Sequence, residues 1–152
     1  MYELRNVKGH YTHDGYSFVA SIYEDGTKIG TVENDGRGGC CCYVFNDGFG
    51  RQSKHYLAFV ATAVANGHGD FEPEDGLIYA LLDEHETRRM LRRAAKTSIL
   101  FLLDGDSIED GVRTLKVKAV TPEVTASARK YLTDKYGTAA KVWDGTAFTA
   151  CA

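Results

Sequence analysis

The sequence predicts an α+β protein, in which an antiparallel β-meander precedes two helices, a β-hairpin, a third helix and a short strand. Eight Asp-Gly pairs punctuate the 152 residues, and four of them fall in the first third, between strand-like runs. Helical periodicity begins only after residue 50. No repeat or low-complexity tract divides the chain. We therefore expect a single domain over 1–152, with a meander subdomain at 1–50 and a helical and β portion at 51–152.

The meander is predicted from alternating apolar and polar residues in four runs, at 2–8, 15–24, 27–34 and 41–46. Asp-Gly favours tight hairpins because both residues tolerate a positive φ. The pair Asp25-Gly26 alone separates the second run from the third, which is a strong hairpin signal. In the second run, one face of the strand is expected to carry the apolar side chains of Tyr16, Phe18, Ala20 and Ile22.

Two helices are predicted next. The first covers 51–67 and ends at Asn66-Gly67, because glycine readily adopts the conformation that closes a helix. A loop at 67–76 follows, with Pro73 just before or in the first turn of the next helix. That long helix covers 76–96, and its spacing predicts a buried apolar stripe of Ile78, Leu81, Leu82, Met90, Leu91 and Ala94.

The last third returns to strands. Residues 98–104 form a continuous apolar run, typical of a central strand buried on both faces, and 112–120 is its expected hairpin partner. A helix is predicted at 121–137, because Thr121 suits the N-cap, Pro122 suits the first helical position and Gly137 suits the stop. A short strand is expected at 138–145.

Composition limits the function classes. The chain is 43% hydrophobic and 26% charged, with a formal net charge of −3. This balance argues against nucleic acid as the main partner. The longest apolar stretch, 56–65, is too short for a membrane span, which needs roughly 20 residues. The first ten residues lack the pattern of a signal peptide. We expect a cytoplasmic protein with reduced cysteines and no cofactor.

The stretch NDGRGGCCCYVF at 34–45 has the composition most typical of a functional site, with three glycines, an arginine and three consecutive cysteines. One interpretation is an anion cradle built from backbone N–H groups and the Arg37 side chain, over residues Asp35, Gly36, Arg37, Gly38 and Gly39. Its spacing matches neither a P-loop nor a dinucleotide fingerprint, because the glycines open a strand. We favour a turn with a glycine bulge, in which backbone geometry, rather than a ligand, requires the three glycines.

The three consecutive cysteines admit three interpretations: buried small apolar residues, a metal site shared with His10 and His13, or a reactive thiol. Adjacent residues of a strand point to opposite faces. Cys41 should therefore face away from Cys40 and Cys42, and we expect at least two of the three thiols to be buried. No metal site and no catalytic residue are predicted.

A partner surface is predicted from arginines and loop aromatics. Arg88 and Arg92 form one ridge of the long helix, and Arg89 and Arg93 form a neighbouring one. Glutamates three or four residues earlier also suit a simple solvated helix face, which is the interpretation we favour for the arginines by themselves; the alternatives are a surface for an acidic protein partner or for nucleic acid. Aromatic side chains in or beside glycine-rich loops are further candidates, because tyrosine and arginine are favoured at interfaces. They are Tyr11, Tyr16, Tyr43, Phe45, Phe49 and Phe71, of which Tyr43 and Phe49 are the preferred two.

Residues 15–39, GYSFVASIYEDGTKIGTVENDGRGG, resemble the N-terminal module of small uncharacterised proteins of phages, prophages and plasmids. A weaker similarity covers ILFLLDGD at 99–106 and TPEVTASARKYLTDKYG at 121–137. The resemblance implies an accessory protein of a mobile element, one that blocks a host defence system. It carries no catalytic signature and assigns no functional residue.

Taken together, the sequence favours a small binding protein that modulates a host protein, such as a nuclease or another defence component, by stoichiometric association. The first rival is a nucleotide or phosphate binder that uses the glycine turn and the helix arginines. The second is a small enzyme with a cysteine nucleophile, which we regard as the weakest interpretation.

Overall fold

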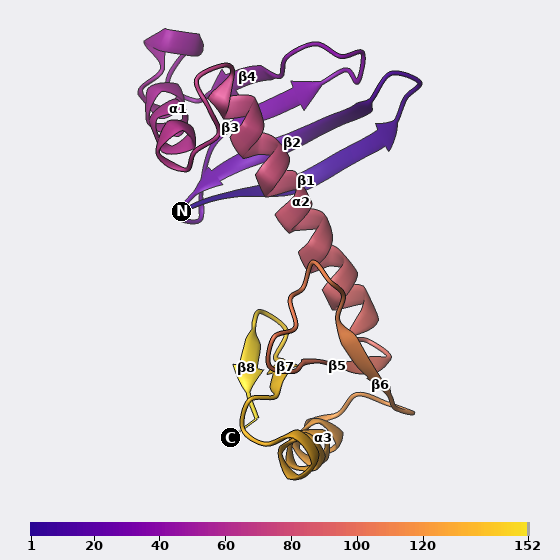
Figure 1. Ribbon diagram of the computed structural model, residues 1–152. Helices are drawn as coiled ribbons and strands as arrows, with labels where there is room; N and C mark the ends of the chain where they lie inside the picture. The colour runs from indigo at the N-terminus through magenta and orange to yellow at the C-terminus, as the bar shows by residue number, and fades with distance from the viewer. Residues whose placement is uncertain (152) are drawn as a thin grey trace. The chain divides into compact units, whose positions relative to one another are not determined.

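A computed structural model describes residues 1–151, and it confirms the α+β class (Figure 1). The chain divides into two compact units, Met1–Glu86 and Thr87–Ala152. The boundary falls within helix α2 (Pro73–Ala94), so this helix contributes its first part to one unit and its last part to the other. The expected single domain stays a prediction, because a division by contacts does not measure folding cooperativity.

The N-terminal unit contains the predicted meander. Its four antiparallel strands lie in chain order: β1 (Tyr2–Tyr11), β2 (Tyr16–Glu24), β3 (Thr27–Asn34) and β4 (Cys42–Phe45). The hairpin between β2 and β3 is confirmed, since Asp25 and Gly26 take φ values of 48° and 81°. β1 runs three residues beyond its expected end and carries a bulge between Arg5 and Lys8.

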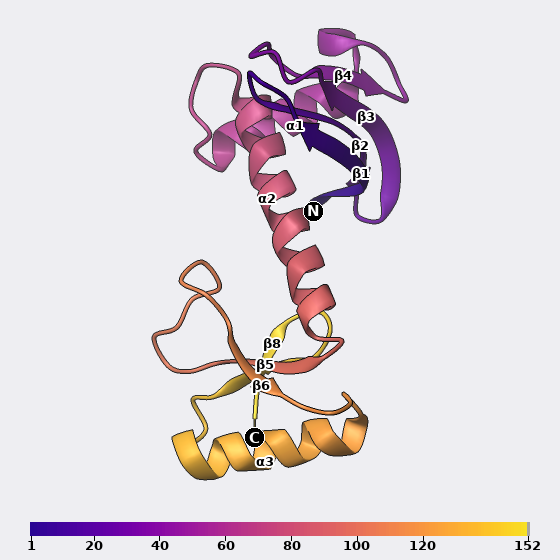
Figure 2. The same cartoon turned by 90° about the vertical axis from the view of Figure 1, so that its right-hand side faces the viewer.

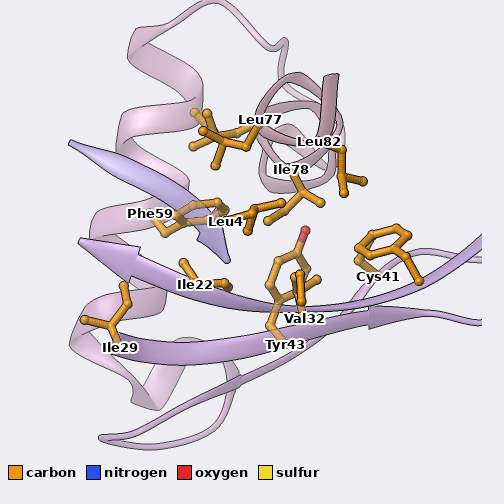
Figure 3. Close-up of a cluster of buried hydrophobic side chains, with 14 of the residues drawn as sticks. Leu4, Ile22, Ile29, Val32, Cys41, Tyr43, Phe59, Leu77, Ile78 and Leu82 are labelled. Carbon is orange, nitrogen blue, oxygen red and sulfur yellow. The ribbon is translucent and has the colours of Figure 1, made fainter. Parts of the chain in front are cut away.

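One face of this sheet is covered by α1 (Lys54–Ala65) and the first part of α2 (Figure 2). Figure 3 shows the resulting core, in which Phe59 of α1 and Ile78 of α2 pack onto Leu4, Ile22 and neighbouring side chains of the sheet. As predicted, Phe18, Ala20 and Ile22 are buried on one face of β2, and Tyr16 is partly buried. Burial of this apolar face, at about 25 cal/mol per Å², is the main stabilisation of the unit.

The start of α1 differs from the prediction. Residues Gly50–Gln52 form a separate 3₁₀ turn, and the α-helix begins at Lys54. Ser53 is the N-cap, and its hydroxyl accepts a hydrogen bond from the Tyr56 N–H at 3.0 Å. The same hydroxyl donates to Asp47, and this bond lowers the pKa of the Asp47 carboxyl. A helix begins where its first N–H groups find acceptors, and here Ser53 and Asp47 supply them.

The start of α2 also differs, because the helix begins at Pro73 rather than at residue 76. Asp75, in its first turn, is 9% exposed and lies beside the N-terminal sheet. Its carboxylate accepts hydrogen bonds from the Cys41 N–H at 2.9 Å and from the Tyr43 hydroxyl at 2.5 Å. Figure 3 shows Tyr43 directing this hydroxyl from the sheet toward α2. Asp75 therefore fixes the edge strand β4 to the helix.

The C-terminal unit has its own sheet, with the strand order β6-β5-β7-β8. The strands are β5 (Ser98–Leu102), β6 (Arg113–Lys116), β7 (Lys141–Trp143) and β8 (Phe148–Ala150). The buried central strand and its hairpin partner are confirmed. So is α3 (Pro122–Tyr136), including its Thr121 cap and its Gly137 stop. β8 was not predicted, because three residues after an Asp-Gly turn carry too little periodicity.

Both faces of this second sheet are covered. Ile99, Phe101 and Val142 pack on α3 through Leu132, whereas Leu100 and Trp143 contact Leu91 of α2. The predicted stripe of α2 is correct except at Met90, which is 59% exposed. The stripe spans the boundary between the units. Its first residues, Ile78, Leu81 and Leu82, pack in the N-terminal core, whereas Leu91 and Ala94 pack in the C-terminal unit.

The turn between β3 and β4 is held by Gly36. This residue is buried and has a φ of 72°. A Cβ at Gly36 would lie 2.6 Å from the Ser17 nitrogen and 2.9 Å from the Tyr16 carbonyl carbon. Its carbonyl also accepts a hydrogen bond from the Thr12 hydroxyl at 2.6 Å. Gly38 has a φ of 81° but open space around it, while Gly39 has neither constraint.

We expect Gly36→Ala to destabilise the protein by about 1–3 kcal/mol, because the new methyl group meets backbone atoms and the φ is unfavourable. Gly39→Ala is the matched control and should leave stability within about 0.5 kcal/mol of wild type. Chemical denaturation followed by circular dichroism measures both. Equal stability of the two variants would contradict the assignment of this constraint to Gly36.

We expect Asp75→Ala to lower the free energy of unfolding by about 2–4 kcal/mol, because the Tyr43 hydroxyl and the Cys41 N–H would be left buried without an acceptor. Asp83→Ala, an exposed change on the same helix, is the control and should be nearly neutral. Hydrogen–deuterium exchange should rise in residues 41–45 of the Asp75 variant. Unchanged protection there would show that packing alone holds β4.

Candidate functional site

The face of the N-terminal sheet opposite α1 and α2 carries a hollow of about 750 Å³. We call it the open-face hollow, and it is lined by residues from all four strands and from the turn after β3. They are Lys8, Gly9, His10, Ser17, Phe18, Val19, Glu33, Asn34, Asp35, Gly39, Cys40 and Cys42. No sequence motif predicts it, because its residues come from five separate segments.

Strand register explains how these side chains meet. Lys8 pairs with Val19, Val19 with Glu33, and Glu33 with Cys42, so the four residues form one row across the sheet. All four are exposed. Side chains directly opposite in antiparallel strands lie about 5 Å apart. The row therefore places an ammonium group, an apolar side chain, a carboxylate and a thiol in sequence across the hollow.

A second set of groups extends this surface toward the turn. His10 pairs with Ser17 on the neighbouring strand, and Asp35 and Cys40 line the hollow beyond the end of β3. The hollow is basic on the side of β1 and acidic at β3. Glu33 and Asp35 are thus the groups able to receive a cation, and Lys8 is the group able to receive an anion or a carbonyl oxygen.

Charge is divided unevenly between the two units. Residues 1–86 contain six Lys or Arg and fourteen Asp or Glu, a formal net charge of −8. Residues 87–152 contain twelve and seven, a net charge of +5. The −3 of the whole chain conceals this separation. The open-face hollow therefore lies in the acidic field of its own unit, which attracts cationic ligands.

The glycine turn does not have the geometry of an anion cradle. The Gly36 N–H donates to the Asn34 side-chain oxygen at 2.8 Å, and the Arg37 N–H donates to the Asp35 carboxylate at 3.0 Å. These two backbone donors are already occupied, and one of their acceptors is itself an anion. The arrangement is a side-chain-capped turn. It holds Asp35 and Gly39 beside the hollow.

The cysteines alternate as predicted, but only one of them is buried. Cys41 is 6% exposed, whereas Cys40 and Cys42 are exposed and line the hollow. The expectation that at least two thiols are buried is wrong, because β4 has a core on one side only. Burial raises the pKa of the Cys41 thiol to about 11, which opposes formation of a nucleophilic thiolate.

A metal site formed by these cysteines with His10 and His13 is one of the interpretations that the sequence allows. Within residues 1–151, no group of three or more His, Cys, Asp or Glu side chains is arranged to hold a metal ion. His10 does line the hollow, yet its cross-strand partner is Ser17.

The predicted partner residues do not form one surface. Arg88, Arg89, Arg92 and Arg93 are all exposed on the part of α2 that belongs to the C-terminal unit. Phe49 is 68% exposed and belongs to the N-terminal unit. Tyr43 is 9% exposed, so its expected place on a surface is wrong. It faces inward because its hydroxyl is bound by Asp75, and Phe45, two residues later, is buried on the same face.

Comparison of the chain with protein-family models, curated proteins and solved structures gave no match. Within residues 1–151, no helix combines the length and the apolar character that a membrane span requires. The function must therefore be inferred from the chemistry of the described residues.

We expect alkylation by iodoacetamide at pH 8 to modify Cys40 and Cys42 at rates close to those of the unfolded chain. Cys41 should react at least 100-fold more slowly, because it is buried and its raised pKa leaves about one thiolate in a thousand at this pH. Mass spectrometry of the digested protein assigns the sites, and labelling in denaturant is the control. Rapid labelling of all three in the folded protein would contradict the inward orientation of Cys41.

Proposed function

We propose that this protein is a stoichiometric binding protein that holds a basic segment of another protein in its open-face hollow. The observation that carries the proposal is the position of Glu33 and Asp35 in a hollow of the −8 unit. Complementary charge speeds encounter and selects the partner. The action is association without chemistry, in the cytosol of a host cell.

A protein segment suits the hollow better than a small ligand does. Small-molecule sites enclose most of their ligand and are lined chiefly by apolar side chains. The open-face hollow lies on one face of a sheet, and six of its twelve lining residues carry polar or charged side chains, with Val19 as an exposed apolar member. A lysine or arginine of the partner would pair with Glu33 or Asp35, and its aliphatic stem would cover Val19.

The resemblance to accessory proteins of phages and plasmids adds the class of partner. Proteins that handle nucleic acids, such as nucleases of host defence systems, carry Lys and Arg for phosphate contacts. An acidic hollow is complementary to such a surface. The rival function, a nucleotide or phosphate binder, is disfavoured because the Gly36 and Arg37 N–H groups of the turn are occupied and two carboxylates line the hollow.

We expect Val19→Arg to abolish partner association while leaving stability nearly unchanged. Val19 is 43% exposed at the centre of the hollow, so an arginine there fills it and repels a cationic segment. Val44→Arg is the matched control, since Val44 is 45% exposed on the same side of β4 as Cys42 and lies one row away, opposite Thr31. Exposed changes of this kind usually cost under about 0.5 kcal/mol.

The measurement begins with capture from a bacterial host lysate on immobilised protein, and then uses the purified partner in a titration. Support requires a basic partner bound at a 1:1 ratio, with at least tenfold weaker binding for Val19→Arg and wild-type affinity for Val44→Arg. Lys8→Glu, which makes the hollow more acidic, should strengthen binding. Equal affinities for both arginine variants, or weaker binding by Lys8→Glu, would reject the open-face hollow as the binding site.

A further inference from the structure

A group of basic side chains gathers at one end of the C-terminal unit. Arg92 and Arg93 lie in the last turn of α2, and Lys96 follows directly after it. The strand register then pairs Ser98, the first residue of β5, with Lys116 of β6. Lys118 follows two residues later. We call these five exposed residues the basic end; they are Arg92, Arg93, Lys96, Lys116 and Lys118.

The acidic residues nearest in sequence outside the hairpin are Glu86, six residues before Arg92, and Glu123, five residues after Lys118, and a further acidic group lies at the other end of the hairpin. Asp104, Asp106, Glu109 and Asp110 belong to the loop that joins the far end of β5 to β6. Asp106 accepts hydrogen bonds from the Arg113 guanidinium at 2.6 and 3.1 Å, and these bonds lower its pKa to about 2. The carboxylates of this loop therefore lie at the opposite end of the hairpin from the basic end.

The chemistry of the basic end matches phosphate. Guanidinium groups bind phosphate oxygens through two parallel hydrogen bonds, and lysines add mobile point charges. Arg88 and Arg89 lie one turn earlier, at the four-residue spacing that places them beside Arg92 and Arg93. Because Arg88 and Arg89 also interact with other residues of the protein, they extend the surface but do not define it. The unit as a whole carries +5.

We propose that the basic end binds the phosphate backbone of nucleic acid without reading its sequence. Arg and Lys on a helix and the adjoining hairpin supply positive charge, and contacts to phosphate carry no sequence information. The low net charge of the chain argues against nucleic acid as a partner only while the two units are counted together. This proposal concerns the C-terminal unit and does not rest on the open-face hollow.

The test is fluorescence anisotropy of a labelled 30-base-pair DNA duplex, titrated with the full chain at several salt concentrations. Five phosphate contacts give a slope of about −4 to −5 in a plot of log K against log salt. The double variant Arg92→Gln and Arg93→Gln should reduce this slope by about 2 and weaken binding about tenfold or more at low salt. A difference between the circular dichroism spectra of the double variant and the wild type would reveal any loss of folding.

Three controls make the result decisive. Lys130→Gln with Lys141→Gln removes the same charge from exposed positions of α3 and β7, outside the basic end, and should keep most of the slope. An equal loss in this control would mean that net charge alone attracts DNA, and would overturn the proposed surface. Polyglutamate of matched charge should compete at least tenfold less well than unlabelled DNA, and equal competition would assign the basic end to an acidic protein instead. Val19→Arg should leave the slope unchanged, which separates this result from that of the hollow.

Discussion

The arrangement of the N-terminal unit around β4 depends on the hydrogen bonds that the Asp75 carboxylate accepts. An anion that is 9% exposed is costly unless strong donors surround it, and here the Tyr43 hydroxyl and the Cys41 N–H supply them. Both donors come from the segment around β4, the edge strand with only four residues. So short a strand cannot hold its register by ladder hydrogen bonds alone. A fixed Tyr43 sets the parity of β4, and this parity directs Cys40 and Cys42 outward into the wall of the hollow.

The same logic shows why the reactive-looking stretch at 34–45 is mainly structural. Gly36 is required because backbone atoms of β2 lie where a side chain would be, and the N–H groups of Gly36 and Arg37 are bound within the turn. Glu33 and Asp35 supply two anions that line the hollow beside this stretch, while the Arg37 side chain is exposed in the turn itself. The chemistry of this region therefore comes from the row of side chains that strand pairing brings together, rather than from the glycines that first attract notice.

Local signals were the predictable part of this fold. The Thr121 cap, Pro122 and Gly137 define α3 from their own sequence, and Asp25-Gly26 defines a hairpin in the same way. Prediction was wrong where a distant partner decides the outcome: Tyr43 turns inward because Asp75, 32 residues later, accepts a hydrogen bond from its hydroxyl. Met90 is exposed although it lies between the packed residues of α2 in the C-terminal unit. The hollow could not be predicted from the sequence for the same reason. Its row of Lys8, Val19, Glu33 and Cys42 exists only once the four strands are in register.

Whole-chain charge was the most misleading quantity. Electrostatic attraction is screened over roughly 8 Å at physiological salt, so a partner senses the charges near its own contact rather than the sum over 152 residues. The two proposed surfaces therefore depend on local groups, the carboxylates of Glu33 and Asp35 for cationic side chains and the guanidinium groups of Arg92 and Arg93 for phosphates. These preferences are complementary in a particular way. A protein that handles nucleic acid is basic where it contacts its substrate, so one chain with both surfaces would hold that protein and its nucleic acid through different groups, without competition between them.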